Sequence, residues 1–267
     1  PNTNSTACVD AGEGWYANGT GNTAATPCPS GTYNPNPTSS SAADCIVVEP
    51  GYYAPMVGNS EPVPCSTGTY QPLAGQASCL EADPGYFVQS HGQTNQTACE
   101  PGTYQNLPGQ SRCFDADPGF YVNTTAASNQ TACDPGSYQS ASASTFCIST
   151  SPGHYTDSPG ANYQKACPAG SYQPLGGMAS CELADPGHFV EGEGKLSQRA
   201  CQPGTYNPDE GGDREESCLQ AEIGHYVPER ASAQQFPCAL GTYQRDEGMV
   251  ACDDASVGHF VNSTGSY

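Results

Sequence analysis

Fifteen cysteines are the residues of this 267-residue chain whose type and spacing could do chemistry. The steps between them alternate between a constant 20 residues and a shorter 14, or 17 in two copies, so the sequence repeats every 34 or 37 residues. Regular cysteines in a chain rich in Gly and Pro indicate disulfides formed in an oxidising compartment. Zinc binding is the competing chemistry, but it needs pairs of ligands only about two residues apart, and the shortest step here is 14.

Two pairings between neighbouring cysteines are open, one across the short step, which leaves Cys8 over, and one across the 20-residue step, which leaves Cys252 over. We favour the short step because its C-x2-G-[ST]-Y start would fold a hairpin back toward the closing cysteine. The three extra residues of the longer copies would then fit at the hairpin tip. Each closure of a loop of about 15 residues stabilises a fold by roughly 3 kcal/mol. The predicted pairs are Cys28–Cys45, Cys65–Cys79, Cys99–Cys113, Cys133–Cys147, Cys167–Cys181, Cys201–Cys218 and Cys238–Cys252.

Cys8 is the odd cysteine under the favoured pairing. By the period, its partner would lie upstream of residue 1. Either the chain is a segment of a longer array, or Cys8 forms an intermolecular disulfide.

Each repeat contains two half-units that predict turns and short strands. One reads C-x2-G-[ST]-Y, as in CEPGTY at 99–104, and the other reads C-x5-G-aromatic-aromatic, as at the end of DADPGFY at 115–121. The glycine supplies a turn and the aromatic residues begin an extended stretch. We therefore predict small disulfide-rich all-β repeats in an elongated, rod- or solenoid-like tandem array of about seven units, with almost no helix. A helical solenoid is rejected because it needs long amphipathic stretches free of Gly and Pro.

The cysteine that begins each short step sets the predicted repeat boundaries. They are a partial N-terminal repeat at 1–27, repeats at 28–64, 65–98, 99–132, 133–166, 167–200 and 201–237, and a truncated C-terminal repeat at 238–267.

Composition and charge exclude several classes of partner. Seven Lys and Arg stand against 27 Asp and Glu, a formal charge of −20, so nucleic acid and anionic membrane surfaces are not expected to bind. The sequence has no run of about 20 apolar residues, and we expect no direct membrane insertion by this segment.

Six N-x-[ST] motifs predict N-glycosylation and hence a product of the secretory pathway. Asn18, Asn123 and Asn262 each lie ten residues after a cysteine, and Asn4, Asn95 and Asn129 each lie four residues before one. Such fixed registers predict two exposed lines for bulky sugars. Ser/Thr-rich stretches at 38–41 and 141–145 are compositional candidates for O-linked sugars. Beyond covalent glycans we expect no cofactor.

Histidine and aspartate recur in register without indicating catalysis. His154, His188, His225 and His259 occupy a register that holds Trp15, Tyr52, Tyr86 and Phe120 in other copies. A general base cannot be exchanged for Phe, so we interpret these histidines as ring-stacking residues. Asp83, Asp117 and Asp185 each open a Pro-Gly turn, with weak calcium binding as the alternative. We assign no catalytic residue and no metal site, and predict that the chain is not an enzyme.

The half-units also resemble known extracellular modules. The C-x2-G-[ST]-Y unit closing about 14 residues later resembles the first loop of tumour-necrosis-factor-receptor-type cysteine-rich modules. Its alternation with C-x5-G-aromatic-aromatic more closely resembles the ephrin-receptor-like cysteine-rich repeat of many extracellular proteins, including algal flagellar-hair (mastigoneme) proteins. The resemblance runs from Cys8 to Cys252, although a repeat of those relatives often has four or more cysteines and here has two. It implies an extracellular repeat fold of the type also called EGF/TNFR-like, and no catalytic residues.

Two functions from different classes follow. The first is a non-catalytic structural subunit or segment of a secreted, glycosylated extracellular filament or surface appendage, with self-association into a filament. The alternative is the cysteine-rich ectodomain of a cell-surface receptor or adhesion protein that binds a protein ligand. The candidate contact face, either to a partner or to the next subunit, is formed by the sequon-free repeats around Cys167 to Cys252, since six of the seven basic residues lie from residue 165 onward.

Overall fold

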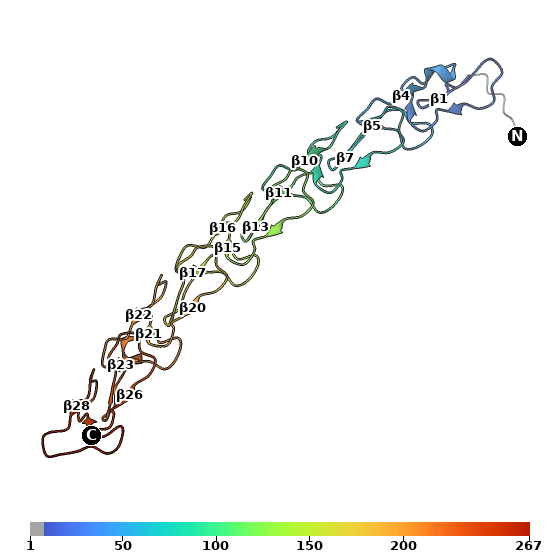
Figure 1. The fold of residues 1–267 in the computed structure, drawn as a ribbon. Helices are drawn as coiled ribbons and strands as arrows, with labels where there is room; N and C mark the ends of the chain where they lie inside the picture. The colour runs from blue at the N-terminus through green and yellow to red at the C-terminus, as the bar shows by residue number, and fades with distance from the viewer. Residues whose placement is uncertain (1–7) are drawn as a thin grey trace. The chain divides into compact units, whose positions relative to one another are not determined.

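Figure 1 shows the chain as a computed structural model that describes residues 8–267. It forms two compact units. Of the described residues, unit 1 contains those up to Asp117, Tyr121–Thr131 and Ser142–Thr145, and unit 2 contains Pro118–Phe120, Ala132–Ala141 and Phe146–Tyr267. In the described residues every strand is two residues long and every sheet has two strands. The only helices there are the single 3-10 turns η1 (Ala42–Asp44) and η2 (Glu215–Ser217). Small disulfide-rich all-β repeats are thus confirmed.

The strands pair in sequence order as antiparallel hairpins. In unit 1 these are β1 (Trp15–Tyr16) with β2 (Thr26–Pro27), β3 (Thr32–Tyr33) with β4 (Ile46–Val47), β5 (Tyr52–Tyr53) with β6 (Val63–Pro64), β7 (Thr69–Tyr70) with β8 (Leu80–Glu81), β9 (Tyr86–Phe87) with β10 (Thr97–Ala98), and β11 (Thr103–Tyr104) with β12 (Phe114–Asp115). Strands β13 (Phe120–Tyr121) and β14 (Thr131–Ala132) contain residues of both units.

Unit 2 continues the same order. Its hairpins are β15 (Ser137–Tyr138) with β16 (Ile148–Ser149), β17 (His154–Tyr155) with β18 (Lys165–Ala166), β19 (Ser171–Tyr172) with β20 (Glu182–Leu183), β21 (His188–Phe189) with β22 (Arg199–Ala200), β23 (Thr205–Tyr206) with β24 (Leu219–Gln220), β25 (His225–Tyr226) with β26 (Phe236–Pro237), and β27 (Thr242–Tyr243) with β28 (Asp253–Asp254).

Hairpins of two kinds alternate. We call them cysteine hairpins, which begin at a cysteine that opens a short step, and disulfide-free hairpins, which begin at Ala, Val or Thr. Both start with a tight turn that ends in a glycine, so that the amide of Tyr86 donates to Asp83 O at 2.9 Å and that of Thr69 donates to Ser66 O at 2.9 Å. Gly85 has a φ of 88°, which explains why these turns need glycine.

A repeating set of backbone hydrogen bonds joins each hairpin to the next. Around the hairpin that opens at Cys65, the Cys65 amide donates to Gly51 O, and the Gly51 amide donates to Gln71 O. The Gln71 amide then donates to Gln93 O, and the Gly92 amide donates back to Cys65 O, all at 2.8–3.0 Å. Equivalent bonds recur along unit 1 and along unit 2. Within each unit the hairpins therefore form one continuous ladder rather than independent beads (Figure 1).

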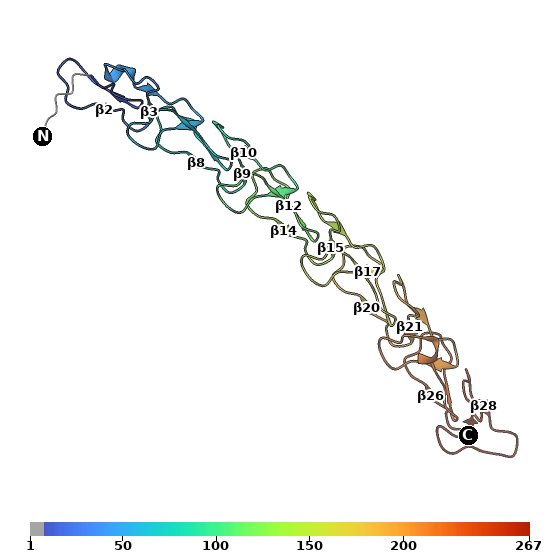
Figure 2. The ribbon, with the colours of Figure 1, turned by 180° about the vertical axis from the view of Figure 1, so that it is seen from behind.

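Hairpins of the same kind also touch. A Cβ added to Gly68 would lie 2.0 Å from the carbonyl oxygen of Gly109, in the next cysteine hairpin along unit 1. Gly51 meets Gly92 O in the same way between two disulfide-free hairpins, at 2.3 Å. Each hairpin thus contacts both the next hairpin and the one after it. Within a unit, cysteine hairpins therefore touch cysteine hairpins and disulfide-free hairpins touch disulfide-free hairpins. Figure 2 shows this succession in unit 1 from behind.

The core is two narrow columns of small side chains. One column holds the opening residues, such as Cys65, Ala82 and Cys99, all fully buried. The other column holds the residue that directly follows the first strand of each hairpin. It is Gln or Asn in the cysteine hairpins, such as Gln71, and a small side chain such as Val88 or Thr156 in the disulfide-free hairpins. With so little apolar side chain buried per repeat, covalent and hydrogen-bonded closures must hold the hairpins shut.

Candidate functional site

The described residues contain seven disulfides, one in each cysteine hairpin, and they join the pairs across the short step. The structure links Cys28–Cys45, Cys65–Cys79, Cys99–Cys113, Cys133–Cys147, Cys167–Cys181, Cys201–Cys218 and Cys238–Cys252, with Cα–Cα distances of 5.6–5.8 Å. Cys8 is an exposed free cysteine. The opening cysteine of each pair is buried and belongs to the core column.

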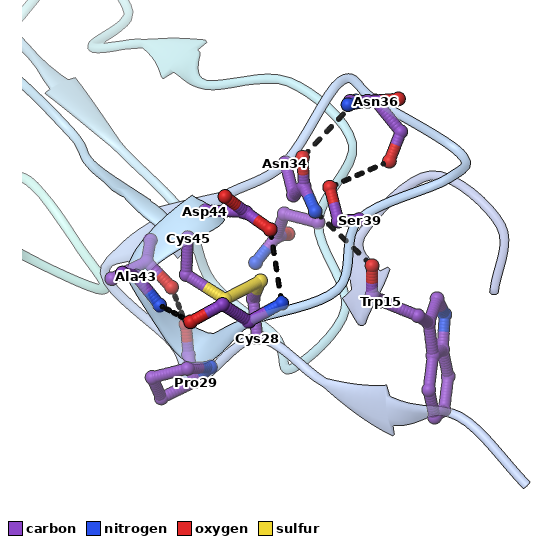
Figure 3. The surroundings of a disulfide bond; sticks show 12 residues. Trp15, Cys28, Pro29, Asn34, Asn36, Ser39, Ala43, Asp44 and Cys45 are labelled. Carbon is purple, nitrogen blue, oxygen red and sulfur yellow. Dashed lines mark hydrogen bonds between the residues drawn. A yellow bond between two sulfur atoms is a disulfide. The ribbon is translucent and has the colours of Figure 1, made fainter. Parts of the chain in front are cut away.

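The three extra residues of the 37-residue copies form the 3-10 turns. Figure 3 shows the first copy, where η1 lies directly before Cys45 and Ser41 caps it by accepting the Ala43 amide at 3.1 Å. In the same hairpin the Asn34 side chain donates to Trp15 O at 3.1 Å, in the preceding hairpin, and accepts the Asn36 amide at 3.0 Å. The insertion thus lies in the hairpin loop, at its C-terminal end.

In the 34-residue copies a buried glutamine replaces this asparagine and organises the loop. The Nε2 of Gln105 donates to Arg112 O at 2.8 Å, just before the closing cysteine, and its Oε1 accepts the Leu107 amide at 3.0 Å. The same pair of bonds is made by Gln71, Gln139, Gln173 and Gln244. The sequence analysis did not identify these glutamines. The motif G-[ST]-Y-Q, which recurs in the 34-residue copies, could have indicated them.

A glutamine takes the place of the closing cysteine in five of the seven disulfide-free hairpins. Gln198 Oε1 accepts the Asp185 amide at 2.7 Å, and Gln198 Nε2 donates to the Asp185 carboxylate at 2.6 Å. We call this arrangement the glutamine clasp. Both of its bonds are made by Gln96, Gln130, Gln198 and Gln235, and Gln164 makes only the bond to the backbone amide, that of Ser151. The corresponding residues of the first two disulfide-free hairpins are Ala25 and Pro62.

The clasps account for the recurring aspartates. The carboxylates of Asp83, Asp117 and Asp185 each accept a clasp glutamine, and the carbonyls of Asp83 and Asp185 accept the turn amide three residues later. These contacts fit the β-turn interpretation. Within residues 8–267 no three His, Cys, Asp or Glu side chains gather as a metal site.

The histidine register is a packing position beside glycine. The ring of His225 lies against Gly265, where an added Cβ would be 3.9 Å from Cε1, and Phe120 and Trp15 lie in the same way against Gly160 and Gly58. The imidazole Nδ1 of His154, His188 and His225 also contacts the carbonyl oxygen two residues earlier, at 3.2–3.3 Å. The contact across the hairpins that the structure shows for His225 is thus with a glycine turn, and ring stacking of these histidines stays a prediction.

Four of the sequon asparagines that the structure describes, Asn18, Asn95, Asn123 and Asn129, lie on disulfide-free hairpins, and Asn262 follows the last hairpin. Asn18, Asn95, Asn123, Asn129 and Asn262 are exposed. Asn4 lies outside the described residues. Asn95 and Asn129 precede an opening cysteine, whereas Cys8, four residues after Asn4, belongs by its spacing to the closing class. Asn4 therefore does not share their register.

Ion pairs occupy one of the sequon registers in unit 2. Asp157 and Glu191 correspond to Asn123 of the preceding disulfide-free hairpin. Lys165 Nζ lies 3.0 Å from Asp157 and holds the pKa of that exposed carboxyl below its usual range. Arg199 lies 3.7 Å from Glu191. The position that holds the sequon residue Asn123 in one disulfide-free hairpin therefore holds an acidic residue paired with a basic residue in the next two disulfide-free hairpins.

The shared feature of the described residues is covalent closure, because a disulfide joins the two ends of every cysteine hairpin. Neither helical turn in the described part of the chain has the length to cross a bilayer. The disulfides indicate folding in an oxidising environment. No protein-family profile and no curated protein matches the chain. The cysteine-rich repeats are plain in the structure, while the ephrin-receptor-like and tumour-necrosis-factor-receptor-like assignment stays a prediction.

Proposed function

We propose that the chain is a non-catalytic structural subunit or segment of a secreted, glycosylated extracellular filament or surface appendage, of the kind that mastigoneme-like hairs represent. The observation that carries the proposal is uniformity. The same backbone bonds join successive hairpins along each unit, and a disulfide closes every second hairpin. A ladder whose every step makes the same bonds suits a load-bearing or spacing role.

The exposure of the sequon asparagines supports the proposal. Four exposed sequon asparagines fall on disulfide-free hairpins, and a net charge of −20 keeps such a product dispersed until it assembles. We expect mass spectrometry of secreted protein, before and after enzymatic removal of N-linked sugars, to show occupancy of Asn18, Asn95 and Asn123. Unmodified peptides at all three would contradict the glycosylated assignment.

Electron microscopy of native, unreduced material tests the filament directly. The expected result is long regular fibres with sugar density along them. Adding a reducing agent should break the fibres if Cys8 links chains, and a Cys8→Ser variant is the matched control, because the seven internal disulfides remain. Isolated molecules at high protein concentration would overturn the filament.

A receptor or adhesion ectodomain is the second candidate, favoured by the hairpin from β21 to β22. Its loop forms a shallow hollow lined by Val190, Lys195, Leu196 and Arg199, and no sequon lies on it. A cross-linking pull-down from cell-surface extracts tests this candidate. Loss of a captured protein with Lys195→Glu and Arg199→Glu together would support it over the filament.

A further inference from the structure

One hollow in unit 1 has part of a glycosylation motif in its wall. It has a volume of about 310 Å³ and lies where the disulfide-free hairpin of β9 and β10 meets the next cysteine hairpin. Phe87 and Thr97 line it, and Thr97 is the threonine of the sequon that begins at Asn95. Sites for small molecules begin at about 300 Å³, so the hollow has room for a single sugar ring.

Asn95 lies on the side of the hairpin that faces this hollow. Phe87 and Thr97 are direct partners in the antiparallel pair, so their side chains share one side. Asn95 is two residues before Thr97, which places it at most about 7 Å away. Side chains alternate along an extended chain, and Gln96, between the two, turns instead to the Asp83 carboxylate. Asn95 therefore shares the side of Thr97 and Phe87.

The equivalent hairpin of unit 2 has the same arrangement. Ser197 and Arg199 stand in the repeat where Asn95 and Thr97 stand in unit 1. Both Ser197 and Arg199 line one hollow. A residue at the place of Asn95 thus lies beside the same hollow as a residue at the place of Thr97.

Two sequon-free hairpins of unit 2 cover the matching ring with a cation. Phe189, which corresponds to Phe87, is 3% exposed, and the Arg199 guanidinium lies 5.2 Å from its ring centroid. Lys165 lies over the Tyr155 ring in the same way, at 5.8 Å. Phe87 has an uncharged threonine at that place and is half-buried. The hairpin that carries a sequon therefore leaves its ring open to another occupant.

We infer that the first sugar of an N-glycan on Asn95 packs on the Phe87 ring and fills this hollow. One face of N-acetylglucosamine presents C–H groups, which the negative face of an aromatic ring attracts. Its hydroxyl and acetamide groups can pair with Gln89 of the same hairpin and with Glu100 and Arg112 of the next, which also line the hollow. The inference rests on the glycosylated product proposed above, and it assigns one glycan the role of joining two hairpins.

NMR of the glycosylated chain with isotope-labelled sugars tests the contact directly. The ring current of Phe87 should shift the signals of the first N-acetylglucosamine on Asn95 upfield from those of the sugar on Asn262. Phe87→Leu should abolish this shift while keeping an apolar side chain in place. Phe189→Leu, in a sequon-free hairpin, is the matched control and should preserve it. A sugar on Asn95 without the shift would overturn the inference.

Amide hydrogen exchange measures what the contact does to the hairpin. The Cys99 amide donates to Gly85 O across this hairpin at 2.9 Å. Asn95→Gln removes the glycan and should speed exchange of that amide about two- to tenfold, the range for an aromatic contact, but should change it little when Phe87→Leu is already present. Asn18→Gln removes a sugar of the other register and should leave the Cys99 amide unchanged. Equal acceleration with and without Phe87→Leu would refute the contact.

Mass spectrometry and microscopy of the same samples separate this inference from the proposed function. An unmodified Asn95 on a chain that is glycosylated at Asn18 and Asn123 refutes the contact alone, and unmodified peptides at all three refute the glycosylated product as well. A shifted and protecting sugar on molecules that never form fibres would refute the filament and leave the contact standing.

Discussion

The glutamine clasp makes a sharp prediction about what closes the disulfide-free hairpins. Gln198→Ala removes both bonds to Asp185, at 2.7 and 2.6 Å. One neutral hydrogen bond contributes about 1 kcal/mol and one to a charged group about 1.5–3 kcal/mol, so for a half-buried glutamine we expect a loss of about 2 kcal/mol. That corresponds to about a 30-fold rise in local opening. The disulfide of the preceding hairpin, Cys167–Cys181, is untouched.

Amide hydrogen exchange under oxidising conditions measures this opening. The Cys201 amide, which donates to Gly187 O across the affected hairpin at 2.8 Å, should exchange about 30-fold faster. The Ala184 amide, which donates to Gly170 O of the disulfide-bonded hairpin at 2.9 Å, should change little. Equal acceleration of both amides would mean that unit 2 opens as a whole, and the clasp would not be a local closure.

An engineered disulfide tests whether the glutamine clasp closes its hairpin at the same place where a disulfide closes the neighbouring hairpin. Ala184 and Gln198 stand where Cys167 and Cys181 stand in the neighbouring hairpin, and Ala184 is fully buried like Cys167. Ala184→Cys with Gln198→Cys should therefore oxidise to a bond and protect the hairpin beyond the wild type, by up to about 3 kcal/mol for a loop of about 15 residues. Two free thiols after oxidation would refute the correspondence between clasp and disulfide.

Three further substitutions probe the ladder, the core and the surface. Gly68→Ala should destabilise unit 1 by about 2 kcal/mol more than Gly241→Ala, as measured by urea unfolding. Both glycines have a positive φ, but only Gly68 faces a carbonyl, 2.0 Å from the added Cβ, while Gly241 has nothing within 4 Å; equal losses would contradict the close approach. Gln105→Ala should cost about 2–4 kcal/mol in the same assay, because it strands a buried amide and a carbonyl. Lys165→Gln should raise the Asp157 pKa toward its usual value in an NMR titration, since Lys165 now stabilises the carboxylate; any stability that this pair provides is lost as the pH falls through that pKa, and an unshifted titration would refute the pairing.

The cysteine spacing was enough to define the 34- and 37-residue repeats, and the half-units of glycine and aromatic residues were needed to predict the all-β fold and to favour the short-step pairs. Gly85 and Asp83 were readable as a turn because Pro-Gly pairs have a local conformation of their own. The clasp was not readable, because Gln96 and Asp83 lie 13 residues apart and neither residue type alone indicates a partner. Gln71 was missed for another reason: a polar residue next to a tyrosine is usually exposed, and here burial is set by the neighbouring hairpins.

The contact between hairpins of the same kind has a consequence that a simple 34-residue count hides. Had each hairpin touched only its immediate neighbours, sugars and disulfides would alternate along every surface. Because Gly68 meets Gly109 and Gly51 meets Gly92, features of one kind of hairpin add up along a unit. Sequon asparagines such as Asn95 then gather on the hairpins that carry the clasps, while the disulfides gather on the other kind of hairpin. A sequence that repeats two different hairpins thereby builds two different series of hairpins, one that carries exposed sequon asparagines and one that is closed by disulfides.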